Sequence, residues 1–201
     1  EENKEGYDTM RLFKLDYGTA PTLYFDPKPD GFERKIREGT SDYRLPNDVI
    51  NPGIAEKIAF MTVAELSHLI KNKKITATEL TNIYLHRLEV YNDTLQASVT
   101  ITRDLALQQA KKADEEINAG IYRGPLHGIP YGIKDLFSVP GYKTTWGAMP
   151  YKDQEINEKA EIVQKLEDAG AILVAKLTSG ALARGDVWFG GKTKNPWDLK
   201  Q

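Results

Sequence analysis

The chain of 201 residues contains no cysteine, which excludes disulfide bonds, thiolate catalysis and cysteine-containing metal sites. It also lacks any apolar run that approaches the roughly 20 residues of a membrane span, so no span is expected. Acidic and basic residues are interspersed and nearly balance, with a net charge of −2. This balance predicts no surface for nucleic acid or anionic membranes. The remaining composition, 40% hydrophobic and 28% charged, is that of an ordinary α/β protein.

The lack of cysteine does not assign a compartment, because cytosolic and exported proteins both occur without it. The chain starts at Glu1 rather than at Met, which we interpret as a processed or engineered product. A removed signal peptide is one explanation of this start. An exported or periplasmic location and a cytoplasmic one therefore both stay open, as does the oligomeric state.

Residues 1–60 are polar and weakly periodic, and they predict an N-terminal extension that packs on a domain formed by residues 61–201. Four prolines break regular structure in this part: Pro27, Pro29, Pro46 and Pro52. Its aromatic residues are predicted to anchor it on the domain: Tyr7, Phe13, Tyr17, Tyr24, Phe25 and Phe32.

Helical signals begin at residue 62. Capping boxes at Thr62 and Thr76 open two helices, and Asn92-Asp93 is predicted to end the second one. A third helix is expected over residues 103–119, with Gly120 as the residue that follows its end.

Strand signals alternate with these helices. Residues 97–101 alternate between apolar and polar side chains, and residues 171–175 form the apolar run that is typical of a strand buried on both faces. A helix stopped by Gly170 precedes that run, so strand, helix and strand predict a right-handed parallel crossover. No helix or strand is expected in residues 190–201.

The stretch from Gly124 to Phe137 is the candidate site. It is predicted to form a turn, a short buried strand and a lysine, Lys134, at the end of the strand. Burial disfavours the charged form of a lysine and lowers its pKa, and a neutral amine is a general base. The alternative is an ordinary ion pair between Lys134 and Asp135 that caps the strand.

Other polar residues are weaker candidates. His68, His86 and His127 do not have the spacing of metal ligands. The first two are predicted on helices as surface or boundary residues, and His127 is predicted to bond to backbone in a turn. Ser179 follows a strand but lacks the surroundings of a nucleophile elbow, and it is interpreted as a loop serine. Gly191-Lys192-Thr193 resembles the end of a phosphate-binding loop, but Asn195-Pro196 follows where a helix is required.

Taken together, residues 62–198 resemble the amidase signature family. The resemblance is carried by the helix pair from Thr62 to Tyr91, by Gly124-Pro125-Leu126-His127-Gly128-Ile129-Pro130 leading into Lys134-Asp135, by Thr144-Thr145, by the run from Gly170 to Lys176, and by Asn195-Pro196-Trp197. It implies the N-terminal part of an α/β fold with a mixed, mostly parallel sheet covered by helices. The implied reaction is hydrolysis of, or transfer at, a small-molecule carboxamide, with no cofactor or metal.

The family uses a Ser–cis-Ser–Lys triad, and Lys134 matches the position of its lysine. The Gly/Ser-rich segment that supplies both serines is expected directly after Asp198, whereas the sequence stops at Gln201. None of the serines in this chain matches either position, so it is predicted to be inactive alone and to need the C-terminal portion of the domain as its partner. Those serines are Ser41, Ser67, Ser98, Ser138 and Ser179.

Two alternatives stay open. In the first alternative to an amide hydrolase, the chain is part of the A subunit of a glutamine-dependent tRNA amidotransferase, within the same family. In the second, it is a non-catalytic fragment or binding module. The family's acidic and aromatic residues after the strand are replaced by Ser179-Gly180-Ala181-Leu182-Ala183, so substrate preference is not carried over.

Overall fold

The computed structural model describes Thr9, Leu12 and residues 45–200. The chain divides into two units, Glu1–Asp42 and Tyr43–Gln201. In the first unit, the backbone N–H of Leu12 donates to the carbonyl of Thr9 at 3.1 Å. The predicted aromatic anchors lie outside the described residues, and the extension over residues 1–60 stays a prediction. The predicted anchors are Tyr7, Phe13, Tyr17, Tyr24, Phe25 and Phe32.

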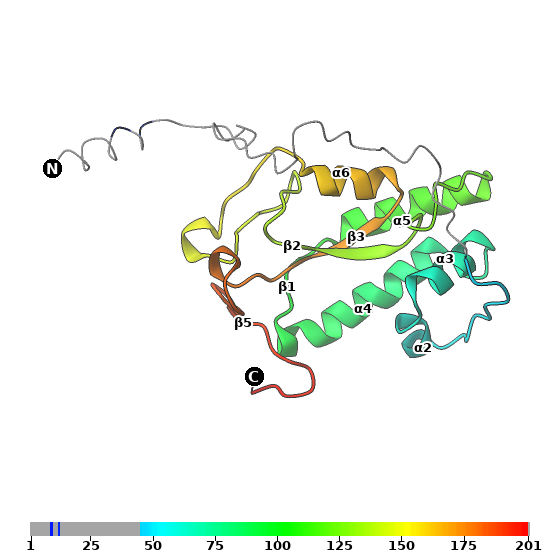
Figure 1. Ribbon diagram of the computed structural model, residues 1–201, viewed down its shortest axis with the longest axis horizontal. Coiled ribbons are helices and arrows are strands. Elements are labelled where there is room, and N and C mark those ends of the chain that lie inside the picture. Colours follow the sequence, from blue (N-terminus) through cyan, green and yellow to red (C-terminus); the bar gives the residue numbers. More distant parts are fainter. Residues whose placement is uncertain (1–8, 10–11, 13–44, 201) are drawn as a thin grey trace, which may run out of the picture. The chain divides into compact units, whose positions relative to one another are not determined.

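Helices and strands alternate along the second unit (Figure 1). Its helices are α2 (Ala55–Ala59), α3 (Val63–Lys71), α4 (Ala77–Leu95), α5 (Arg103–Asn118) and α6 (Glu161–Asp168), with 3₁₀ turns η1 (Met149–Tyr151) and η2 (Ala181–Ala183). Its strands are β1 (Ser98–Ile101), β2 (Pro130–Lys134), β3 (Ile172–Leu177), β4 (Val187–Trp188) and β5 (Gly191–Lys192). None of the helices in the described part of the chain has the length and apolar character needed to cross a bilayer.

The main sheet has the strand order β1-β3-β2, so the last of these strands in the sequence lies in the middle. β3 pairs antiparallel with β1 and parallel with β2. All residues of β3 except Leu177 are buried, as its apolar sequence predicts. The α/β class and the mixed sheet expected from the sequence are therefore confirmed.

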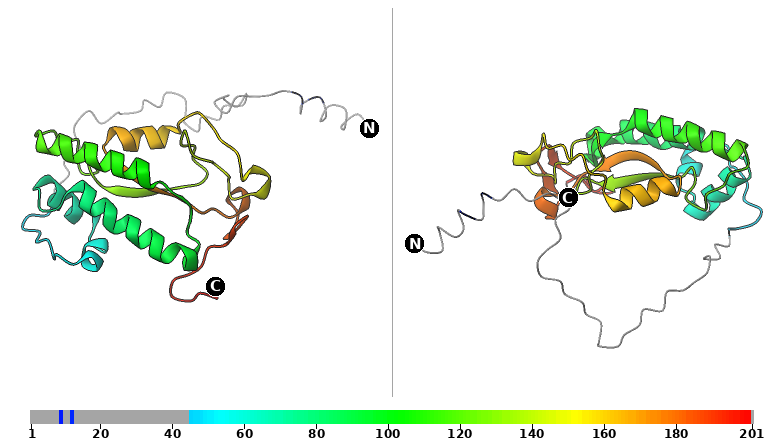
Figure 2. Two further views of the ribbon diagram at one scale, coloured as in Figure 1. Left: turned by 180° about the vertical axis from the view of Figure 1, so that it is seen from behind. Right: turned by 90° about the horizontal axis from the view of Figure 1, so that it is seen from above.

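Helices cover both faces of this sheet, which gives three layers (Figure 2). On one face, Ile172 and Val174 of β3 pack against α4 and against the small residues Ala106 and Ala110 of α5. On the other face, Leu173 of β3 packs in a cluster with Val163 of α6 and Ile133 of β2. Alanines on α5 leave room for a close approach of helix and sheet.

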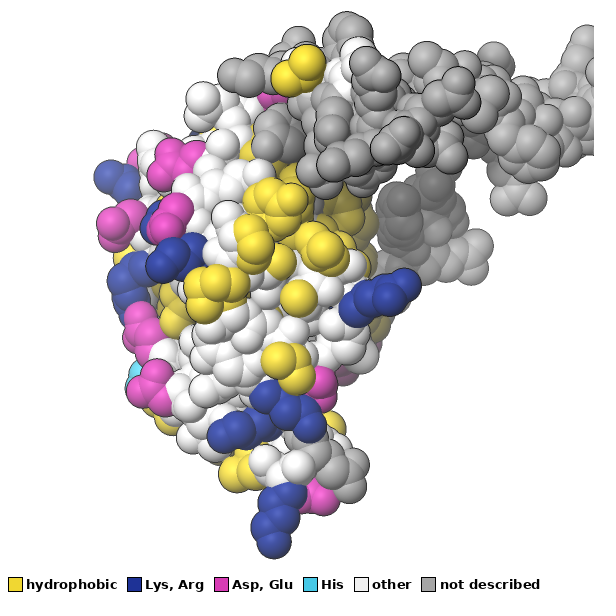
Figure 3. All heavy atoms as spheres, turned by 90° about the vertical axis from the view of Figure 1, so that its left-hand side faces the viewer, with side chains coloured by type: hydrophobic (Ala, Val, Ile, Leu, Met, Phe, Trp, Pro, Cys, Tyr) yellow, Lys and Arg dark blue, Asp and Glu magenta, His cyan; other side chains and the backbone are white. Residues whose placement is uncertain are grey.

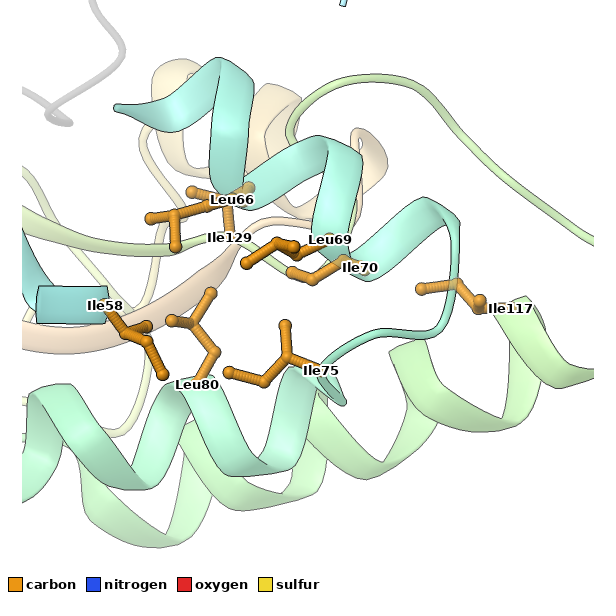
Figure 4. Packing of buried hydrophobic residues seen from close by; sticks show 8 residues of the cluster. All are labelled: Ile58, Leu66, Leu69, Ile70, Ile75, Leu80, Ile117 and Ile129. Atoms are coloured by element: carbon orange, nitrogen blue, oxygen red, sulfur yellow. The ribbon is translucent and has the colours of Figure 1, made fainter. Parts of the chain in front are cut away.

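A second core lies between α2, α3 and α4 (Figure 4). Ile58 of α2 points toward Leu80 of α4, and Leu66 and Leu69 of α3 close the cluster from the other side. Leu69 and Leu80 are fully buried. Burial of a leucine side chain stabilises a fold by about 1.5–3 kcal/mol, so this cluster fixes the helix pair against the rest of the unit.

The structure confirms the predicted helices, corrects the end of one of them and adds a short hairpin. α4 continues to Leu95 instead of ending at Asn92-Asp93, because the left-handed turn that stops it is made by Gln96, at φ 50°. The final residues contain a short antiparallel hairpin, β4 with β5, so the prediction of no strand there is wrong. Gly120 follows the end of α5 with φ 85°, as expected.

Both capping boxes are present, and that of Thr76 offers a direct test. Its hydroxyl accepts from the backbone N–H of Glu79 at 3.0 Å, and the Glu79 carboxylate accepts from the N–H of Thr76 at 2.8 Å. Thr76→Ala is expected to lower the free energy of unfolding by about 1 kcal/mol, measured by urea denaturation. Thr94→Ala, at an exposed position of the same helix, is the matched control and is expected to change it by less than about 0.5 kcal/mol. Equal effects of the two substitutions would contradict the capping role.

Candidate active site

The carboxyl ends of β2 and β3 lie side by side and form the candidate site. Lys134 and Leu177, the last residues of the two strands, are partners in the parallel ladder. The N–H of Asp135 donates to the carbonyl of Leu177 at 2.8 Å and extends the ladder by one residue. Ligands of open α/β sheets bind at the carboxyl ends of the strands, so this edge is where a reaction centre is expected.

Lys134 is exposed in the structure, and the prediction that it is buried is wrong for the described chain. The physical reason is its position on β2, which is an edge strand of the described sheet. Gly132, on the same face of the strand, is exposed as well.

The buried lysine is Lys176, near the end of β3. Its side chain is 0% exposed, and its Nζ lies 2.7 Å from Oδ1 of Asp135, whose side chain is also 0% exposed. The same ammonium donates to Oγ1 of Thr144 at 2.7 Å and to the carbonyl of Lys143. The predicted ion pair of Asp135 with Lys134 is therefore replaced by a pair with Lys176.

Burial lowers the pKa of Lys176, while the hydrogen bond and the charge of the Asp135 carboxylate oppose this shift. The other carboxylate oxygen of Asp135 accepts from the backbone N–H of Thr145 at 3.0 Å and from its hydroxyl. The ammonium and the carboxylate are thus compensated by each other and by hydrogen bonds to Thr144 and Thr145. Removal of one partner alone would leave a buried charge and cost about 3–5 kcal/mol of stability.

An irregularity in the parallel ladder directs Lys176 toward Asp135. Tyr131 pairs with Leu173, and Ile133 pairs with Lys176, so β2 advances two residues where β3 advances three. Successive side chains of a regular strand alternate between faces, and an extra residue reverses this order. Lys176 therefore shares the face of Leu173, whereas regular alternation would direct it toward α4 and α5.

Two loops close over the ends of the strands. The N–H of Leu182 donates to the carbonyl of Trp146 at 2.8 Å, and that of Phe189 donates to the carbonyl of Gly147 at 3.0 Å. Gly147 has φ 68°, and a Cβ at this position would lie 1.9 Å from the carbonyl oxygen of Ser179, so only glycine fits this contact. Ser179 is buried and donates to the carbonyl of Gly180, consistent with a loop serine.

Apolar side chains gather on the face of the molecule that these loops form (Figure 3). The loops themselves carry four of the exposed large hydrophobic residues of the described chain: Met149 and Tyr151 of η1, Leu182 of η2 and Val187 of β4. A patch of this kind beside the ends of the strands is typical of an interaction or ligand-binding surface.

The predicted turn histidine, His127, does bond to backbone. The N–H of Arg123 donates to its Nδ1 at 3.1 Å, and its Nε2 lies 3.1 Å from Oε2 of Glu116. The Nε of Arg123 donates to that same oxygen at 2.7 Å. Burial lowers the pKa of His127, and the charge of Glu116 opposes the shift. This cluster joins the entry of β2 to α5, at the end of β2 remote from Lys134.

The other histidines lie where the sequence places them, with His68 partly exposed and His86 exposed. Within residues 45–200, no three His, Asp or Glu side chains are grouped so that they would hold a metal ion.

Residues 79–201 match the family model described as Amidase. The chain belongs to the amidase family. Two relatives are the A subunits of the glutamyl-tRNA(Gln) amidotransferases of Carboxydothermus hydrogenoformans and Thermoanaerobacter pseudethanolicus. The first is 34% identical over 72% of this chain and 30% of its own length. The second is 38% identical over 70% of this chain and 29% of its own length.

Solved amidase structures share the fold. The native peptide amidase of Stenotrophomonas maltophilia superimposes with a TM-score of 0.64 at 32% identity, over 70% of this chain and 31% of that one. A fatty acid amide hydrolase gives a TM-score of 0.68 at 25% identity, over 75% of this chain and 27% of that one. The chain therefore spans about 30% of the length of the amidases that it matches.

Lys176 is the residue of the site that sequence reasoning missed. Its signal is its position directly after the apolar run of residues 171–175, in a strand predicted to be buried on both faces. Such a strand has no exposed face for a lysine, so a buried counter-charge is required. Asp135, after the neighbouring parallel strand, is the acid that topology brings to it.

The lowered pKa of His127 predicts a pH dependence of stability. The unfolded chain binds a proton near pH 6.5, whereas the folded chain binds it only at lower pH. Between the two pKa values the unfolded state carries more protons, so the free energy of unfolding falls as the pH drops below about 6.5. Thermal unfolding of the wild type is expected to shift to lower temperature between pH 7 and pH 5. The shift should be smaller in His127→Gln, and parallel profiles would contradict the prediction.

Proposed function

We propose that this chain is the N-terminal part of an amidase domain that cleaves carboxamide C–N bonds, with Lys134 as the general base. The single observation that carries the proposal is the place of Lys134, at the carboxyl end of β2 in a chain of the amidase family. In the proposed reaction, Lys134 takes a proton from a bridging serine, and that serine activates the nucleophilic serine. The oxygen of the nucleophilic serine forms a bond with the amide carbonyl carbon, the C–N bond breaks, and the amine leaves with the proton returned from Lys134. Water then attacks the acyl-enzyme, which releases the carboxylic acid and restores the serine hydroxyl.

The exposure of Lys134 fits a site that more protein completes. A lysine acts as a base when its amine is neutral, and burial is one way to obtain this state. The chain spans about 30% of its relatives, and the apolar face beside the strand ends offers a surface for the rest of the domain. In this proposal the C-terminal portion covers Lys134 and supplies both serines.

Three of the four serines in the described part of the chain are buried, and the fourth, Ser138, is partly exposed. Ser67 is fully buried and lies 2.7 Å from the hydroxyl of Tyr122. Ser98 and Ser179 are also buried. We therefore propose that the chain alone does not hydrolyse amides.

A lysine substitution in the complete enzyme tests the base. Lys134→Ala is expected to lower kcat/KM for hydrolysis of a primary carboxamide by about 10²–10⁴-fold, because it removes the proton acceptor. Release of ammonia measures the rate. Lys165→Ala, which removes an exposed lysine of α6, is the control and should leave the rate unchanged. Full activity of Lys134→Ala would refute the proposal, and so would amide hydrolysis by the 201-residue chain alone that depends on Lys134.

A second candidate is the A subunit of a glutamine-dependent tRNA amidotransferase. It is favoured by the names of the relatives, since those above at 34% and 38% identity are glutamyl-tRNA(Gln) amidotransferase A subunits. This candidate predicts that the complete protein co-purifies with partner subunits and releases ammonia from glutamine. A complete enzyme that is active on simple amides without partners would decide against it.

A further inference from the structure

The enclosed pair of Lys176 and Asp135 has no part in the proton transfers proposed above. The ammonium of Lys176 donates to the Thr144 hydroxyl and to the Lys143 carbonyl, and it forms an ion pair with Asp135. Both side chains are 0% exposed, so neither reaches a substrate at the surface. The pair therefore acts on the site, if at all, through the residues that it holds.

Those residues are the ones around Lys134. Asp135 is its immediate neighbour, and the backbone of Asp135 bonds on both sides: its N–H donates to Leu177 at 2.8 Å, and its carbonyl accepts from Trp146 at 3.1 Å. Its carboxylate binds Lys176 of β3 and Thr145 of the following loop. One aspartate thus joins the end of β2, the central strand and the loop that lies over them.

The direction of Lys134 follows from this anchorage. Successive side chains of a strand point to opposite faces, so a fixed Asp135 on one face fixes the Cα–Cβ direction of Lys134 on the other. Apolar side chains of similar volume would fill the buried space without loss of stability, but they would not form bonds of defined direction.

We propose that the Lys176–Asp135 pair is a positioning device that holds Lys134 in the geometry required for proton transfer. This inference rests on the proposed function, in which Lys134 is the base. A misplacement of a reacting group by about 1 Å costs on the order of 100-fold in rate. Loss of the pair should therefore reduce kcat and affect KM little, because Lys134 itself remains.

The test compares Lys176→Met, Asp135→Asn and the double variant Asp135→Asn/Lys176→Met. Each single substitution leaves one buried group without its partner and is expected to lower the unfolding temperature. The double variant removes both charges and should recover most of that temperature. In the complete enzyme its kcat should nevertheless stay about 100-fold below wild type, with KM within about threefold. Lys165→Met, which breaks an exposed pair of 3.3 Å with Glu161, is the matched control and should alter neither value.

Hydrogen exchange in the 201-residue chain gives a second readout that does not depend on activity. The amides of Asp135 and Trp146 should exchange faster in the double variant than in the wild type, while those in the middle of α4 should be unchanged. A double variant with wild-type kcat, or with wild-type exchange at both amides, overturns the inference.

The two proposals fail in different ways. If Lys134→Ala abolishes amide hydrolysis while Asp135→Asn/Lys176→Met stays fully active, the positioning role alone is wrong. If Lys134→Ala is fully active, the proposed base is wrong and the positioning role falls with it, whatever the exchange rates show.

Discussion

A fully enclosed pair of opposite charges, Lys176 with Asp135, is the constraint on which the carboxyl end of the sheet depends. Burial removes the solvation of both charged groups. Each charge is therefore stable in the interior only while the opposite charge is present. The strand irregularity that directs Lys176 and the loop that presents Thr144 and Thr145 both meet this condition. The ends of β2 and β3 and the loop with Thr144 and Thr145 therefore depend on one another through this ion pair.

The two lysines at this edge of the sheet, Lys176 and Lys134, differ in burial and in their partners. Lys176 is buried and charge-compensated, and it contributes order. Lys134, on the adjacent strand, is exposed in the described chain.

Much of the fold was predictable because its signals are local. Capping boxes at Thr62 and Thr76, glycines after α5 and α6, and the apolar run of β3 each specify an element within a few residues. The exposure of Lys134 was not predictable, since it depends on what covers an edge strand. The position of Lys176 after an apolar run signals its burial, but its pairing with Asp135 depends on a register irregularity between segments about 40 residues apart, which no local pattern encodes.

The placement of β3 in the middle of the sheet has a consequence for the order of folding. β1 and β2 pair with β3 and not with each other, yet both precede it in the chain. During synthesis neither strand finds its partner until Leu177 has left the ribosome, so helix pairs such as α4 with α5 have time to form first. Until that moment both strands have unpaired backbone groups that are able to pair with other segments.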